Sequence, residues 1–254
     1  MLDSQNQNFY QGEVVEETFA KKSNKTALSI AKVFLYMFAF IMVTAVTAFG
    51  VGAGLFYGLI VPQNPQTASV YFGLIISSAI LLLIDTVVIN FVLLRGKHSI
   101  LIPAIIYSVL VGILFSGFTI FVDWEIIGMA FGITSLIFLL MSLIAFSTKS
   151  NLSPLLIVAF GILAGVGILA LFSWIMALAT GTIFNALFFA IEVGIFAFIM
   201  IVALVDLWRL KQIAEMGEMS ENIALYCAFT MYTDFISIFI RVLYFLIIIY
   251  GKSK

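Results

Sequence analysis

Seven long apolar runs, separated by short polar segments, are the feature that most constrains how this chain folds. The runs lie at residues 28–60, 70–94, 100–122, 126–147, 154–176, 183–206 and 223–249. A helix of about 20 apolar residues crosses a bilayer core of about 30 Å, and every run is at least that long. Only 10% of the 254 residues are charged, whereas soluble domains have about 25%. The sequence therefore predicts an all-α, polytopic membrane protein with seven transmembrane helices.

The basic residues fall mainly on one side of the predicted transmembrane domain, residues 28–250. Nine of the twelve lie at the N-terminal side of the first run or follow the second, fourth and sixth: Lys21, Lys22, Lys25, Lys32, Arg95, Lys97, Lys149, Arg209 and Lys211. The connections after the first, third and fifth runs contain none. Because basic residues near short loops resist translocation, we expect a flexible, polar, cytoplasmic N-terminal tail, residues 1–27, and an external C-terminal tail, residues 251–254. The short tails favour a prokaryotic plasma membrane, with the endoplasmic reticulum as the alternative.

Five ionisable residues lie inside the apolar runs: Asp85, Glu192, Asp206, Asp234 and Arg241. Each charge near a helix centre costs about 2.5–3.5 kcal/mol on insertion scales unless it is neutralised, paired or hydrated. Asp234 and Arg241 are two helical turns apart and share one face of the last run. We therefore expect these groups to face the bundle interior. Asp85, Glu192 and Arg241 are candidates for a pore or proton site. Alternatively, the two acids are protonated structural groups, and Arg241 snorkels outward or neutralises Glu192 or Asp85.

Several segments together resemble the Bax inhibitor family of transmembrane proteins. The sixth run ends in "VALVDLWRLKQI", and the seventh contains "YTDFISIFIRVLYFLIIIYG". "PAIIYSVLVGILFSGFTIF" and "FGITSLIFLLMSLIAFSTKSNLSPL" are similar to the third and fourth spans of that family. The resemblance covers roughly residues 30 to 250. Val205, Thr233 and Arg241 depart from the family pattern.

This resemblance implies six helices around a central seventh, and a pH-sensitive leak for calcium ions across the lipid bilayer. In that family the aspartates of spans six and seven form a hydrogen-bonded, pH-sensing pair, which corresponds here to Asp206 and Asp234. The same two carboxylates are the candidate calcium ligands. An arginine of span two that locks onto the pair corresponds best to Arg95, and Asp85 matches an acidic position of that span. The resemblance implies no cofactor; calcium is the transported ion.

Two aspartates held close together can act as a proton-controlled switch between two helices. Two carboxylates held close in a low dielectric do not both ionise cheaply, so they share a proton and titrate as a unit. A shared proton ties the two helices together through a charge-assisted hydrogen bond. Its loss brings repulsion, loosens the contact and leaves hard oxygen ligands of the kind that calcium prefers.

The predicted depths of the two aspartates disagree. Asp206 ends the sixth run, whereas Asp234 lies 11 residues into the seventh, about 16 Å along a helix. The disagreement disappears if the seventh helix begins earlier, or if the sixth span extends less far than its hydrophobicity indicates. Glu215, Glu218 and Glu221, in a helix-forming segment, permit a helical connection.

Other functions remain open at this stage. A non-conducting regulatory protein that binds a membrane protease or a cell-death factor is the main alternative, and a proton-coupled carrier that uses Glu192 is another. Intramembrane aspartyl proteolysis is disfavoured because Thr233 and Phe235, rather than glycine, flank Asp234. The single histidine, His98, lies in a loop. We therefore expect no enzyme activity, and nothing in the charge distribution suggests a nucleic-acid partner.

Glycine spacing predicts close helix packing at two places. Gly50, Gly54 and Gly58 recur every four residues in the first run, and Gly161 and Gly165 repeat the spacing in the fifth. Such spacing permits close approach of transmembrane helices. We expect these glycines to lie at helix interfaces inside the bundle, with homodimerisation as the alternative.

Overall fold

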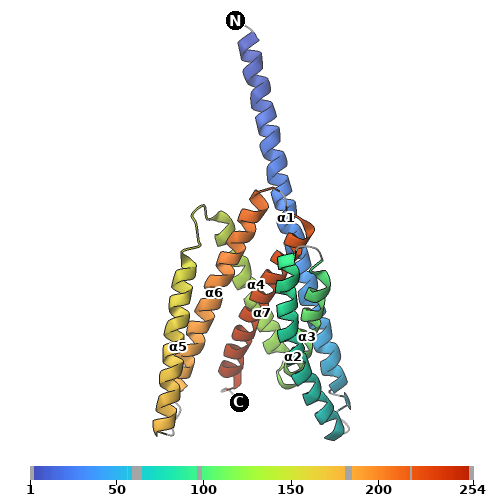
Figure 1. The fold of residues 1–254 in the computed structure, drawn as a ribbon, viewed down its shortest axis with the longest axis vertical. Coiled ribbons are helices and arrows are strands. Elements are labelled where there is room, and N and C mark those ends of the chain that lie inside the picture. The colour runs from blue at the N-terminus through green and yellow to red at the C-terminus, as the bar shows by residue number, and fades with distance from the viewer. Residues whose placement is uncertain are drawn as a thin grey trace.

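A computed structural model describes the backbone at residues 3–55, 57–58, 65–95, 99–180, 185–217 and 219–251. Over these residues it has seven α-helices and no strand, and every helix is long and apolar enough to cross a membrane. The helices are α1 (Asp3–Leu55), α2 (Pro65–Arg95), α3 (Leu101–Phe121), α4 (Trp124–Ser147), α5 (Leu155–Thr180), α6 (Asn185–Glu215) and α7 (Glu221–Gly251). The predicted all-α membrane fold with seven spans is confirmed. The two ends of the chain lie at opposite ends of the bundle (Figure 1).

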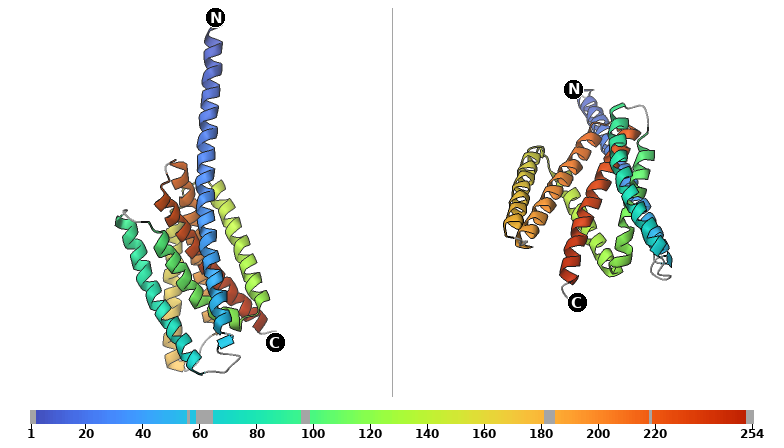
Figure 2. Two further views of the ribbon diagram at one scale, coloured as in Figure 1. Left: turned by 90° about the vertical axis from the view of Figure 1, so that its right-hand side faces the viewer. Right: turned by 60° about the horizontal axis from the view of Figure 1, so that its bottom comes forward.

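Helix α1 begins at Asp3, within the segment expected to be a polar tail, and continues into the first span. Its N-terminal part projects beyond the other helices (Figures 1 and 2). The segment is rich in Glu, Gln, Lys and Ala, which favour helix, and the chain has no proline before Pro62 to interrupt it.

Helix α7 occupies the centre of the bundle (Figure 1). It packs against α1, α4 and α6 and touches α3, whereas α2 packs chiefly on α3 and α5 chiefly on α6. Its buried side chains recur every three or four residues: Ala224, Leu225, Cys227, Ala228, Met231, Tyr232, Phe235, Ile238, Val242 and Leu243. The seventh helix is therefore central, as expected. Four helices rather than six pack directly around it, with α2 and α5 outside them.

The turn between α6 and α7 resolves the disagreement in depth. Helix α6 continues nine residues past Asp206, to Glu215. Leu207, Leu210 and Ala214 are buried on this extension, so packing against the bundle continues the helix through a polar segment. The chain then turns at Gly217, which has a φ of 90° that favours glycine. Asp206 consequently lies well inside α6 and level with the interior of α7.

Candidate functional site

The structure brings Asp206 of α6 close enough to Asp234 of α7 for their carboxyl groups to interact electrostatically. The Oδ2 atom of Asp234 is buried and has no hydrogen-bond partner among the described residues. The Asp206 carboxylate is mostly buried, with a side-chain exposure of 16%, and its Oδ1 atom accepts a hydrogen bond from Arg209. The two acids are thus neighbours on adjacent helices. The hydrogen bond recorded for Asp206 is to Arg209 and not, as the resemblance implies, to Asp234.

Arg209 is a site residue that the sequence reasoning missed. Its Nη1 lies 3.2 Å from Oδ1 of Asp206, one turn along the same helix. A spacing of three residues places such side chains side by side on a helix, and this spacing is the signal that identifies the pair. The expected latch was Arg95. The backbone of Arg95 ends α2, but its side chain lies outside the described residues.

A second charged pair joins the same two helices further towards the C-terminal end of α7. The Arg241 guanidinium donates a hydrogen bond to Oε2 of Glu192 in α6, and the two side chains are 26% and 22% exposed. Phe245 packs against Phe189 and Phe196 beside them. Of the two acids considered as partners for Arg241, the structure therefore pairs it with Glu192.

Asp85 lies apart from both pairs. Its side chain is 8% exposed, and its buried Oδ2 atom has no partner among the described residues. It acts electrostatically on Tyr107 of α3. The Tyr107 ring packs edge-on against Phe229 and Tyr232 of α7. Asp85 is therefore a buried acid on the α2–α3 side of the bundle.

A hydroxyl network joins α1, α3 and α7 on that same side. The Tyr232 hydroxyl lies 2.6 Å from Oγ1 of Thr44, which also donates a hydrogen bond to the Ser108 carbonyl at 3.1 Å. Tyr232 is fully buried. Because Tyr232 precedes Asp234 by two residues, the two side chains leave α7 in nearly opposite directions. Helix α7 is thus fixed by polar contacts on one side and carries the aspartate on the other.

We expect Thr44→Val to destabilise the protein more than Tyr232→Phe does. The valine variant removes both of the hydrogen bonds by which Thr44 joins α1 to α3 and α7, which costs about 1–3 kcal/mol. The phenylalanine variant removes the Tyr232 hydroxyl, while Thr44 retains the Ser108 carbonyl, so the loss is about 1 kcal/mol. Thermal unfolding of the purified variants in one detergent measures the order. A Tyr232→Phe variant that unfolds at the lower temperature would contradict this assignment.

The ion-binding capacity of the site is small. Within the part of the chain that the structure describes, no group of three or more His, Cys, Asp or Glu side chains is arranged to hold a metal ion. Two carboxylates supply at most four of the six to eight oxygen ligands that calcium takes. Asp206 and Asp234 therefore suit a transient contact with a hydrated cation better than a tight resident site. His98 lies outside the described residues.

Seven apolar helices, with α7 at their centre, define an integral, multi-pass membrane protein. Residues 26–250 match the family model described as "Inhibitor of apoptosis-promoting Bax1". The match covers most of the chain, so the protein belongs to this family, the Bax inhibitor family, and the resemblance seen in the sequence is confirmed. A search of curated proteins finds no match.

Proposed function

We propose that this protein is a pH-sensitive calcium leak in which Asp206 and Asp234 form the proton-controlled gate between α6 and α7. The observation that carries the proposal is the buried Asp234 carboxyl, whose Oδ2 has no partner in the described part of the chain and whose electrostatic neighbour is Asp206. An acid placed in this way inside a membrane bundle is a functional-site hypothesis by default. Membership of the Bax inhibitor family agrees with it.

In the proposed mechanism, protonation controls the contact between two helices. With one proton held between Asp206 and Asp234, the α6–α7 contact is closed. When both carboxylates are ionised, they repel each other and attract a cation. Arg209, which is hydrogen-bonded to Asp206 and half exposed, favours the ionised form of its partner. Calcium flux is therefore expected to rise with pH.

The distribution of basic residues supports a proposal for which side of the membrane this gate faces. Arg209 and Lys211 lie near the end of α6, beside the place where α1 enters the bundle. Lys211 donates a hydrogen bond there to the carbonyl of Thr148, the residue before Lys149. Basic residues are retained on the cytoplasmic side. We propose that this end is cytoplasmic, in a prokaryotic plasma membrane, so that the aspartate pair responds to cytoplasmic pH.

The test is calcium efflux from liposomes that contain only the purified protein, measured from about pH 5 to pH 9 to span the ordinary titration range of coupled acids. Wild-type flux is expected to change across this range, whereas Asp234→Asn and Asp206→Asn are expected to give flat profiles. Glu215→Gln, which neutralises a half-exposed acid at the end of α6, is the control and is expected to keep the wild-type profile. Unchanged profiles in both pair variants would exclude the gate.

The same experiment addresses the main alternative, a non-conducting protein that regulates a membrane partner. The specific observation that favours this alternative is the part of α1 that projects beyond the bundle (Figure 1). Wild-type liposomes without calcium flux at any pH would support it. The carrier alternative relied on Glu192 as a proton site, and in the structure that acid is instead bonded to Arg241.

A further inference from the structure

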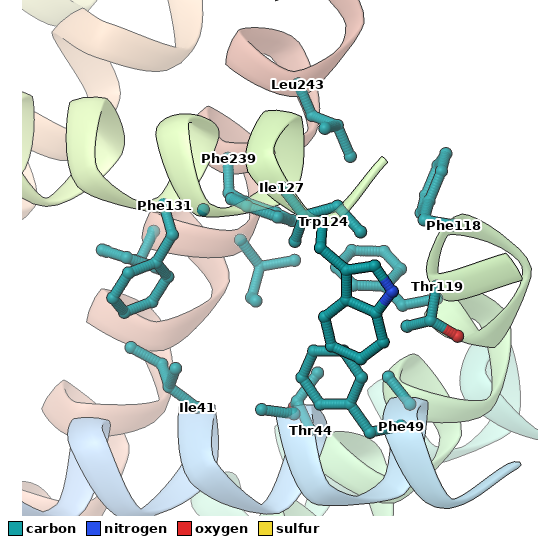
Figure 3. A pocket seen from close by; sticks show the side chains of 16 residues that line it. Ile41, Thr44, Phe49, Phe118, Thr119, Trp124, Ile127, Phe131, Phe239 and Leu243 are labelled. Atoms are coloured by element: carbon teal, nitrogen blue, oxygen red, sulfur yellow. The ribbon is translucent and has the colours of Figure 1, made fainter. Parts of the chain in front are cut away.

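Helices α1 and α4 are separated by an apolar groove whose floor is α7. Two adjoining cavities of about 310 Å³ and about 580 Å³ make up the groove, and both are lined by Ile41 of α1, Phe131 of α4 and Phe235 of α7. Figure 3 shows the smaller cavity, where Ile41 and Thr44 face Ile127 and Phe131 across open space. Cavities of about 300–1,000 Å³ are of the size that holds small ligands.

Aromatic pairs mark both ends of the groove. Phe34 of α1 packs edge-on against Phe146 of α4, with ring centroids 6.3 Å apart. At the other end Phe49 stacks on Trp124, with centroids 4.8 Å apart, as Figure 3 shows. From Phe34 to Phe49 the helix rises by about 22 Å. The groove is therefore longer than one leaflet of the bilayer core, which is about 15 Å.

The chemistry of the groove favours a hydrocarbon occupant over water. The Thr44 and Thr119 hydroxyls already bond to protein groups, as does that of Ser142 in the larger cavity. The other lining side chains are almost all apolar, and such a surface favours hydrocarbon over ordered water. Phe38 and Leu139, on opposite walls, are each 55% exposed, so the groove is continuous with the lipid-facing surface.

The charges at the two ends differ in sign. At the end marked by Phe34, the exposed Lys149 follows α4. Lys32, two residues before that ring, leaves α1 in nearly the opposite direction and is paired with Glu221 at 3.6 Å. At the other end, the acidic residues Asp123 and Glu125 flank Trp124. A phosphate is attracted to the first end and repelled from the second.

We propose that this groove is a phospholipid site: one acyl chain lies between α1 and α4 against α7, with its phosphate at the Lys149 end and its methyl end near Trp124. The proposal does not depend on calcium conduction. Because Phe235 forms part of the floor next to Asp234 in the chain, an acyl chain in the groove contacts the helix that carries the candidate gate.

The test uses fluorescence quenching by a phosphatidylglycerol brominated near the end of its acyl chain, added to protein in detergent. Trp174→Phe and Trp208→Phe leave Trp124 as the single reporter. Quenching of Trp124 is expected to saturate at about one lipid per protein. Brominated phosphatidylcholine, whose headgroup has no net charge, is expected to bind about tenfold more weakly.

Two matched glycines of α4 provide the decisive comparison. A side chain at either Gly128 or Gly132 meets open space, but only Gly128 lines the groove. Gly128→Leu is expected to lower the apparent lipid affinity about tenfold or more, and Gly132→Leu to leave it unchanged. Ala45→Leu fills the groove from the α1 wall and is expected to act like Gly128→Leu, which guards against a local folding defect in α4.

Other results would overturn the proposal. Quenching that rises without saturation, as in any membrane protein surrounded by bulk lipid, would show that the groove holds no specific chain. Equal affinities for Gly128→Leu and Gly132→Leu would place bound lipid elsewhere. Equal binding of phosphatidylglycerol and phosphatidylcholine, unchanged by Lys149→Gln, would refute the proposed position of the phosphate.

Discussion

Arg241→Leu is expected to lower the free energy of unfolding by about 3–5 kcal/mol, because it leaves Glu192 uncompensated between α6 and α7. The two side chains are about three-quarters buried, and their hydrogen bond joins the helices directly. Removal of one member of a buried ion pair costs more than removal of both. Unfolding in mixed micelles, with secondary structure followed by circular dichroism, measures the loss.

The double variant Arg241→Leu with Glu192→Leu separates lost pairing from lost packing. Two leucines of similar volume in a lipid-embedded interface are expected to restore most of the stability. Glu215→Gln is the matched control, because it breaks a pair with Lys211 in which the glutamate is 49% exposed. Its effect is expected to be below about 1 kcal/mol. A loss for Arg241→Leu as small as that of the control would show that the inner pair contributes nothing.

Gly112→Leu is expected to prevent stable packing of α3 on α1, and Gly112→Ala to destabilise the protein by about 1–3 kcal/mol. A Cβ atom at Gly112 would lie 2.6 Å from Cβ of Thr47 and 2.7 Å from the Thr44 carbonyl oxygen. The second atom belongs to the backbone of α1, so a side-chain rotation does not relieve the clash. Thermal unfolding in detergent measures both variants.

Gly54→Ala is the control for this prediction, because a Cβ at Gly54 meets nothing within 4 Å. Alanine favours helix over glycine by about 0.8–1.0 kcal/mol, so this variant is expected to be as stable as the wild type or more stable. Equal destabilisation by Gly112→Ala and Gly54→Ala would contradict the packing assigned to α3 and α1.

The sequence predicted the wrong glycines for helix packing. Gly50, Gly54, Gly161 and Gly165 have the expected spacing, yet a Cβ at any of them meets nothing within 4 Å. The close contacts instead occur at Gly52, Gly112 and Gly194. Spacing identifies a flat helix face, but it does not say whether a neighbouring helix or lipid covers that face.

For the intramembrane acids, too, the sequence showed where the residues are but not which residues they contact. Their presence inside apolar runs was evident from the sequence, because the cost of a charge in lipid makes each one conspicuous. Their partners were not: Asp206 bonds to Arg209 on its own helix, and Arg241 selects Glu192 rather than Asp85. The choice depends on which helices are neighbours and how far each is shifted along its axis.

By itself the sequence determined that the chain crosses a membrane seven times, that it resembles the Bax inhibitor family, and that Asp206 and Asp234 are its most conspicuous acids. Length and hydrophobicity are properties of consecutive residues, so the sequence contains them directly. Only the tertiary structure decided that α6 runs on past Asp206, that Arg209 is its hydrogen-bond partner, and that α1 and α4 leave a groove over α7. These features arise between residues far apart in the chain, where close packing of whole helices determines which side chains meet.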